Sequence, residues 1–138
     1  MDAKEYMKQA RILIRRIERK RNEAQEIRIK ASLPSSPSFS DMPKKATPNP
    51  QQKYDDVHRA IQLDEEANAA FEELEMLKAE FLLVIETVDN PDNRDLLYKR
   101  YIEFKEWKKV AAEIGYSESH TKRLNSIAVK KLIQDDTP

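Results

Sequence analysis

The sequence contains no cysteine and only one glycine, Gly115, among its 138 residues. Without cysteine, neither a disulfide framework nor a thiolate metal site can form, and nothing requires an oxidising compartment. Long apolar runs are also missing: the longest, FLLVI at 81–85, is far shorter than the roughly 20 residues that a membrane span needs. The N-terminal stretch MDAKEYMKQA lacks the apolar region of a signal peptide. We therefore expect a soluble, cytoplasmic protein with no membrane partner.

Residue patterns that carry catalysis are missing as well. A single glycine cannot build a glycine-rich phosphate loop, the two histidines are isolated, and the carboxylates are scattered. His58 lies near Asp55 and Asp56, but one imidazole and two adjacent carboxylates do not converge on a helix surface as metal ligands do. We predict a protein that is not an enzyme and has no cofactor or metal site.

Charge is abundant and unevenly distributed. Asp, Glu, Lys and Arg make up 36% of the chain, well above the usual quarter, and the net charge is zero. Residues 1–30 hold ten basic and five acidic side chains, residues 51–90 hold three and eleven, and residues 91–134 hold ten and six. A neutral total therefore conceals a basic, an acidic and a second basic segment.

The first basic segment is predicted to form a long amphipathic helix. Between residues 3 and 31 there is no Gly or Pro, and apolar residues recur at steps of four and three. They are Tyr6, Ala10, Leu13, Ile17, Ala24, Ile27 and Ala31, with Lys20 at the one missing position. Residues 32–50 follow with five of the seven prolines, which predicts a flexible Pro/Ser loop.

The acidic segment carries a heptad pattern. Nine apolar residues occupy nine consecutive positions of one helix face: Ala60, Leu63, Ala67, Ala70, Leu74, Leu77, Phe81, Val84 and Val88. This pattern is typical of a coiled coil. The basic first helix is the natural partner, folded back antiparallel within the chain or supplied by a second chain, so a homodimer through the heptad helix is one expectation. We predict an all-α protein with a helical hairpin at residues 1–89.

A separate unit is predicted at residues 90–134. Asn90 and Pro91 form an N-cap followed by proline at the first helical position, and we expect helices at about 91–103, 105–113 and 118–133. Gly115 stands where a left-handed residue would end the middle helix. Ser117 is placed to cap the last helix.

The last helix divides into two faces. Its inner face is expected to carry Leu124, either Ile127 or Ala128, and Leu132. Its outer face carries Ser119, His120, Lys122, Arg123 and Ser126. Hydrogen-bonding side chains on the first half of such a helix suit the major groove of DNA, so these five are candidate base-reading residues. The candidate phosphate contacts are Lys105, Lys108, Lys109, Ser117, Lys130 and Lys131.

This segment resembles the helix-turn-helix of region four of sigma factors and related phage regulators. Ala111, Gly115 and Leu124 match that motif, whereas Thr121 stands where an aliphatic residue is usual, which predicts looser packing there. The whole layout is similar to small phage-encoded, sigma-like regulators of the ArpU and RinA type. The resemblance covers essentially the whole chain but is specific only over residues 91–132.

The resemblance implies a sequence-specific transcriptional regulator that binds double-stranded DNA, with RNA polymerase as a further partner. Two alternatives stay open at this point. One is a phage DNA-packaging subunit of the small-terminase kind, in which a helix-turn-helix joins an oligomerising coiled coil. The other is a coiled-coil adaptor that binds RNA polymerase and never contacts DNA.

Overall fold

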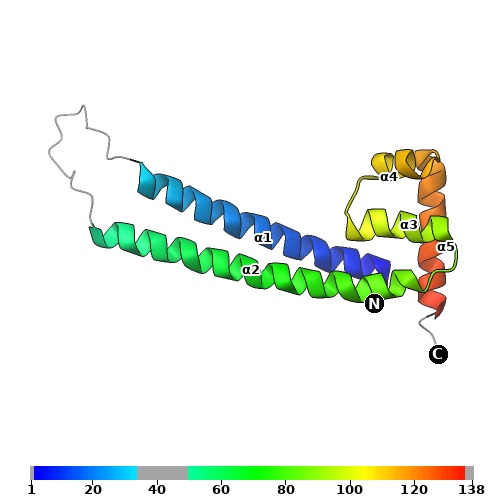
Figure 1. Cartoon of the computed structure of the whole chain (residues 1–138), viewed down its shortest axis with the longest axis horizontal. Helices are drawn as coiled ribbons and strands as arrows, with labels where there is room; N and C mark the ends of the chain where they lie inside the picture. The colour runs from blue at the N-terminus through cyan, green and yellow to red at the C-terminus, as the bar shows by residue number, and fades with distance from the viewer. Residues whose placement is uncertain (1, 34–49, 136–138) are drawn as a thin grey trace. The chain divides into compact units, whose positions relative to one another are not determined.

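The computed structural model describes residues 2–33 and 50–135, and this part of the chain is helical without a β-strand (Figure 1). The elements are α1 (Ala3–Ser32), α2 (Pro50–Glu86), α3 (Pro91–Leu97), the π-helix η1 (Tyr98–Ile102), α4 (Trp107–Ile114) and α5 (Glu118–Asp135). The prediction of an all-α fold is confirmed. Most of the predicted Pro/Ser loop lies outside the described residues. No described helix is both long enough and apolar enough to cross a membrane.

The chain divides into two compact units, and both contain parts of α1 and α2. The first unit comprises residues 1–12 and 74–138, and the second comprises residues 13–73. The unit that contains α3, α4 and α5 is thus larger than the predicted segment 90–134, because it includes the start of α1 and the last turns of α2.

In the second unit, α1 packs on α2 of the same chain. Ala24 of α1 and Ala60 and Leu63 of α2 form a buried cluster, with Ile27 beside it. Small alanine side chains allow the two helix backbones to approach closely. The polar position in the apolar face of α1, Lys20, is neutralised: its Nζ lies 2.7 Å from a carboxylate oxygen of Glu66 on α2. The heptad helix, α2, therefore packs against α1 of the same chain, which is one of the two partners expected for it.

In the first unit, an aromatic cluster joins three segments that are distant in sequence. The ring of Tyr6 in α1 stacks on Phe81 in α2, with 4.1 Å between ring centroids, and Tyr101 of η1 packs against both rings. The Tyr6 hydroxyl donates a 2.7 Å hydrogen bond to the backbone carbonyl of Tyr101. Burial raises the pKa of Tyr6 far above its ordinary value, so the hydroxyl remains a donor throughout the accessible pH range.

The predicted heptad pattern of α2 holds from Ala60 to Phe81 and then changes register. Ile85 is buried at 2% exposure, whereas Val84, the predicted core position, is only partly buried. A straight α-helix has 3.6 residues per turn, so positions that repeat strictly every seven residues drift slowly around it. A step of four from Phe81, to Ile85, brings the apolar side chain back to the buried face.

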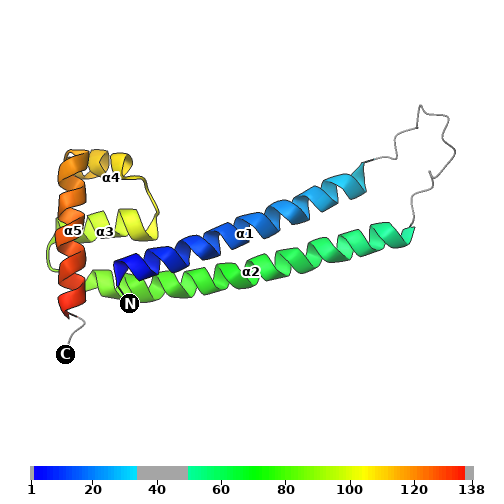
Figure 2. The ribbon, with the colours of Figure 1, turned by 180° about the vertical axis from the view of Figure 1, so that it is seen from behind.

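The three C-terminal helices pack around their own small core, and α5 crosses α3 and α4 (Figures 1 and 2). Asn90 caps α3 as predicted: its side chain accepts hydrogen bonds from the amides of Asp92 and Asn93, and Pro91 occupies the first turn. The predicted helix at 91–103 continues from α3 as the π-helix η1. The buried residues of this core are Leu96, Leu97, Val110, Ala111, Thr121, Ala128 and Leu132.

We predict that Tyr6→Phe lowers the free energy of unfolding by about 1 to 2 kcal/mol, because the buried carbonyl of Tyr101 loses its donor while the ring stacking remains. Urea denaturation followed by circular dichroism measures the change. Tyr54→Phe is the matched control, since Tyr54 is 62% exposed. Equal losses in both variants would show that the buried hydrogen bond does not stabilise the fold.

Candidate nucleic-acid interface

A short turn at Gly115 joins α4 to α5. Gly115 adopts φ 84°, a left-handed conformation that favours glycine, and ends α4 as predicted. The amides of Gly115 and Tyr116 both donate to the carbonyl of Ala111, at 3.0 and 3.1 Å. A single carbonyl near the end of α4 thus accepts from two successive amides, and the chain reverses tightly at this point.

Ser117 directly precedes α5 and makes two hydrogen bonds with its first turn. Its Oγ accepts a 3.1 Å hydrogen bond from the amide of His120, which confirms the predicted N-cap. Its carbonyl accepts a 2.7 Å hydrogen bond from the hydroxyl of Thr121. Thr121 is fully buried and its hydroxyl has a local acceptor. The expectation of looser packing at this position stays a prediction.

Of the two residues that could face inward from α5, Ile127 and Ala128, the structure buries Ala128. Ala128 and Leu132 are buried, Leu124 is partly buried, and Ile127 is 46% exposed. The side chain of Asn125 also faces inward, where its Oδ1 accepts a 3.1 Å hydrogen bond from the hydroxyl of Tyr101. This bond connects α5 to η1.

The outer face of α5 is polar and basic. Four of the five predicted base-reading residues and one predicted phosphate contact are exposed along it at helical spacings of three and four: Ser119, Lys122, Arg123, Ser126 and Lys130. Lys122 forms an exposed ion pair with Glu118 at 3.4 Å, and the Ser126 hydroxyl donates to the Lys122 carbonyl at 3.2 Å. Within the described residues, no carboxylate is paired with Arg123. Its guanidinium is therefore available to an external acceptor.

His120, the fifth predicted base-reading residue, lies at the edge of this face. Its ring is partly buried and packs edge-on against Tyr116, with 4.9 Å between centroids. The Tyr116 hydroxyl in turn donates a 3.3 Å hydrogen bond to Asp92 at the start of α3. Tyr116 thus lies over the turn and restricts the His120 ring.

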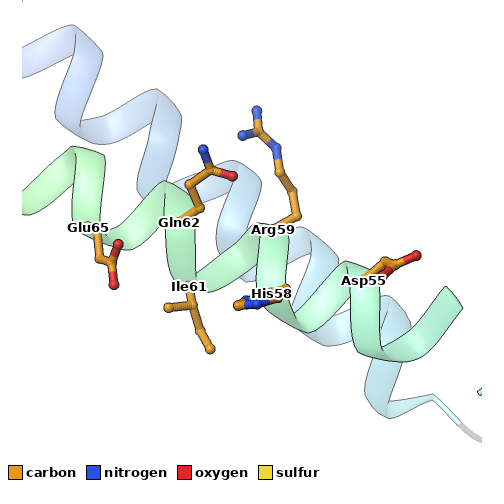
Figure 3. A pocket seen from close by; sticks show the side chains of 6 residues that line it. All are labelled: Asp55, His58, Arg59, Ile61, Gln62 and Glu65. Atoms are coloured by element: carbon orange, nitrogen blue, oxygen red, sulfur yellow. The ribbon is translucent and has the colours of Figure 1, made fainter. Parts of the chain in front are cut away.

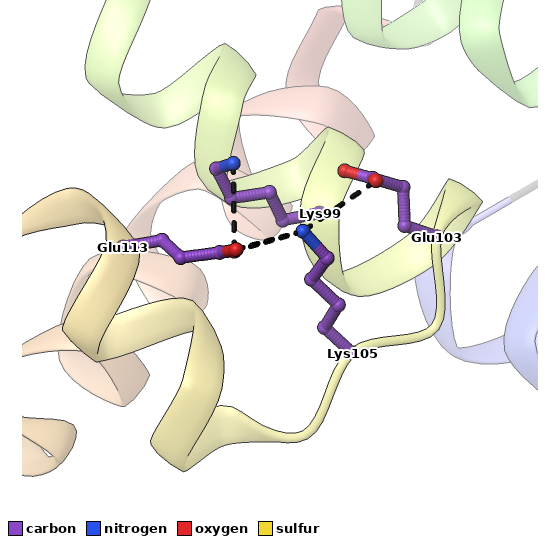
Figure 4. A network of polar contacts seen from close by, with 4 residues as sticks. All are labelled: Lys99, Glu103, Lys105 and Glu113. Carbon is purple, nitrogen blue, oxygen red and sulfur yellow. Dashed lines mark hydrogen bonds and ion pairs between the residues drawn. The ribbon is translucent and has the colours of Figure 1, made fainter.

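The predicted phosphate contact Lys105 is already bound by carboxylates (Figure 4). Its Nζ lies 2.9 Å from Glu113 and 3.5 Å from Glu103, and Lys99 also approaches Glu113, at 3.5 Å. The hydrogen bond between Lys105 and Glu113 lowers the pKa of Glu113 and raises the pKa of Lys105. Lys105 therefore braces η1, the following turn and α4, and is not directly available to DNA.

Lys108 and Lys109, at the start of α4, are exposed as a phosphate contact requires. Beside them, Trp107 is partly buried and carries the guanidinium of Arg100 over its ring, 4.6 Å from the centroid. Arg100 was not among the predicted site residues. Neither periodicity nor spacing indicates it, because Arg100 lies in η1 and the turn at Glu103–Lys105 separates it in sequence from Trp107.

One further depression lies on the outward side of α2 and is lined by Asp55, His58, Arg59, Ile61, Gln62 and Glu65 (Figure 3). All six side chains come from one helix and spread along it. Within the described residues, no group of three or more His, Asp or Glu side chains is arranged to hold a metal ion.

Comparison with known families gives one match. A family model described as a protein of unknown function (DUF1492) matches residues 33–133, which is more than half of the 138-residue chain. No significant match was found among curated proteins or among solved structures.

We predict that Ser117→Ala lowers the free energy of unfolding by about 1 kcal/mol, because the first turn of α5 loses its cap. Thermal and urea denaturation measure the loss. Ser119→Ala is the matched control, since Ser119 is exposed two residues further along the same helix. If both substitutions cost the same, the N-cap is not a stabilising interaction.

We predict that Glu113→Gln destabilises the protein near neutral pH but not in acid. The pKa of Glu113 is lower in the folded protein than its ordinary value. Its contribution is therefore present above the ordinary value and disappears as the pH falls through the lowered one. Urea midpoints of the two proteins should converge on acidification. Glu80→Gln, at an exposed position of α2, should show no such trend; a constant offset at all pH values would contradict the ion-pair interpretation.

Proposed function

The chain belongs to the DUF1492 family of proteins of unknown function, and we propose that it binds double-stranded DNA sequence-specifically and regulates transcription. The base-reading element in this proposal is the exposed face of α5. The protein acts by binding and catalyses no reaction.

The observation that carries the proposal is the contrast between the two faces of α5. The inner face is buried in the core of the unit, whereas the outer face presents serine, lysine and arginine donors directly after a left-handed turn at Gly115. In a helix-turn-helix, the N-terminal half of the second helix enters the major groove and its side chains contact base edges. A helix that serves only as a bundle corner has no need for such donors at its start.

Arg123 is the leading base-reading residue. Arginine can donate two parallel hydrogen bonds to O6 and N7 of guanine, and such a pair contributes about 1 to 3 kcal/mol of discrimination. Lys122 is paired with Glu118 and would have to exchange this exposed carboxylate for DNA. The exchange costs little because exposed ion pairs are weak. Lys108, Lys109 and Lys130 would contact phosphates and contribute affinity without sequence choice.

The resemblance to sigma region four supports transcription, and a phage origin, as the biological setting. A single recognition unit of this size buries little surface, so binding as a dimer on paired half-sites is the economical arrangement. The heptad face of α2 is already covered by α1, as the buried Ala24, Ala60 and Leu63 show. A dimer that involves α2 must therefore use its outward side, where Tyr54 and Ile61 are exposed.

We predict that the purified protein, at about 150 mM salt, selects genomic fragments that share a short motif, and that Arg123→Ala relaxes the motif by about 1 to 3 kcal/mol at one position. Lys108→Ala is the contrasting variant. It should keep the motif, weaken binding to all sequences alike, and lower the salt dependence of log K by about 0.9. Sequencing of the selected fragments and fluorescence anisotropy measure the two effects.

The fragment selection, together with a measurement of the oligomeric state, separates the other functional classes. If no motif is enriched, or if enrichment is indifferent to Arg123, the proposal is wrong and a polymerase-binding adaptor is favoured. A ring of about eight to twelve subunits in solution would favour the DNA-packaging subunit, because such rings are the working form of a packaging assembly and not of a dimeric regulator.

A further inference from the structure

His120 lies beside Arg123, at the edge of the outer face of α5. It precedes Arg123 by three residues, which places the two side chains about 60° apart around the helix axis. The main-chain amide of His120 is fixed by its 3.1 Å hydrogen bond to Ser117 Oγ. Within the described residues, the ring nitrogens of His120 form no hydrogen bond and no ion pair. These nitrogens are therefore available to an external ligand.

The His120 ring packs on Tyr116, which is itself held from the other side. The two rings meet edge-on with 4.9 Å between centroids, and the Tyr116 hydroxyl donates a 3.3 Å hydrogen bond to Asp92 in α3. Tyr116 thus contacts α5 through its ring and α3 through its hydroxyl. All three residues belong to the same compact unit, so these contacts lie within one body.

The main chain of Tyr116 and of Asp92 is fixed as well. The Tyr116 amide donates to the Ala111 carbonyl at 3.1 Å, and the Asp92 amide donates to Asn90 Oδ1 at 2.8 Å. Tyr116 therefore has little freedom to move away from the His120 ring. Its side chain is 40% exposed, so it contributes less to the core of the unit than a buried aromatic residue would. Packing in the core is thus an incomplete account of Tyr116.

We propose that Tyr116 is a positioning residue for base reading: held by Asp92, it orients the His120 ring so that one ring N–H donates to a base of the duplex. The inference rests on the proposed function, because its ligand is the duplex that α5 recognises. It assigns a role in DNA recognition to Tyr116, which is not among the predicted base-reading or phosphate-contacting residues.

The chemistry of the imidazole ring indicates which base it reads. The ring carries at least one N–H in either protonation state. In the major groove, N7 of a purine and O4 of thymine accept such a bond, whereas cytosine presents only its N4 donor. We therefore expect the position read by His120 to exclude cytosine. Three residues advance about 4.5 Å along α5 and base pairs are about 3.4 Å apart, so this position lies next to the base read by Arg123.

The test is a double-mutant cycle on the selected duplex, with affinities measured by fluorescence anisotropy. Tyr116→Ala releases the His120 ring and should lower affinity about two- to tenfold, the cost of immobilising one side chain on binding. His120→Ala should relax the same base position. Tyr116→Ala introduced into His120→Ala should cause no further loss, because no ring is left to position. Affinity for a duplex of unrelated sequence should stay the same in all three variants.

Tyr116→Phe is the conservative variant. It keeps the ring contact and lacks only the hydrogen bond to Asp92, so it should retain the motif and most of the affinity that Tyr116→Ala loses. Tyr98→Ala is the matched control, since Tyr98 is 42% exposed and belongs to the same unit. Within the part of the chain that the structure describes, the Tyr98 ring contacts neither His120 nor Asp92. The motif and the affinity of this control should equal those of the native protein.

A further measurement needs no substitution. Carbon-13 relaxation of the His120 ring in the free native protein should show a ring restricted on the nanosecond timescale. A freely rotating ring would overturn the inference even where Tyr116→Ala fails to fold, because nothing would then be positioned.

The outcomes separate this inference from the proposed function. If the native protein selects a motif through Arg123 but the losses of Tyr116→Ala and His120→Ala add, Tyr116 acts independently of His120. The inference is then wrong and the proposed function stands. A motif that is unchanged in His120→Ala leads to the same conclusion. If no motif is selected, or if selection is indifferent to Arg123, the proposed function is wrong and the inference fails with it.

Discussion

The packing of Tyr6 against Phe81 and Tyr101 is the interaction on which the arrangement of the unit with α3, α4 and α5 depends. It joins the first turns of α1, the last turns of α2 and the π-helix η1, three segments that no local interaction would bring together. Stacking at 4.1 Å provides apolar burial, and the hydrogen bond to the Tyr101 carbonyl provides orientation. The hydroxyl of Tyr101 in turn donates a hydrogen bond to Asn125, which ties α5 to the same cluster.

The presentation of α5 follows from a second set of local constraints. The left-handed Gly115 reverses the chain, Ser117 caps the helix, and Thr121 satisfies its hydroxyl within the first turn. These contacts use the polar groups at the start of the helix internally. The hydrogen-bonding capacity left on the outer face belongs to side chains and can be directed at an external ligand.

Charge is distributed between structural and available groups. Lys99 and Lys105 are paired with Glu113, and Lys20 with Glu66, so these lysines stabilise contacts between elements. Arg123 has no such partner within the described residues. This division explains how a chain of zero net charge can present basic surfaces: the acidic side chains compensate particular lysines and leave others free.

The sequence by itself determined those features that depend on neighbours within a turn or on the period of a helix. The all-α class, the apolar faces of α1 and α2, the Asn90 cap, the Gly115 turn and the Ser117 cap all belong to this group, because each follows from local backbone chemistry or from a repeat of 3.6 residues. Only the tertiary structure decided which residues meet across long separations. It chose the same chain as the partner of α2, buried Ile85 in place of Val84, engaged Lys105 with Glu113, and placed Arg100 on Trp107. These outcomes depend on how helices cross and where a π-turn redirects the chain, and no periodicity in the sequence encodes such contacts.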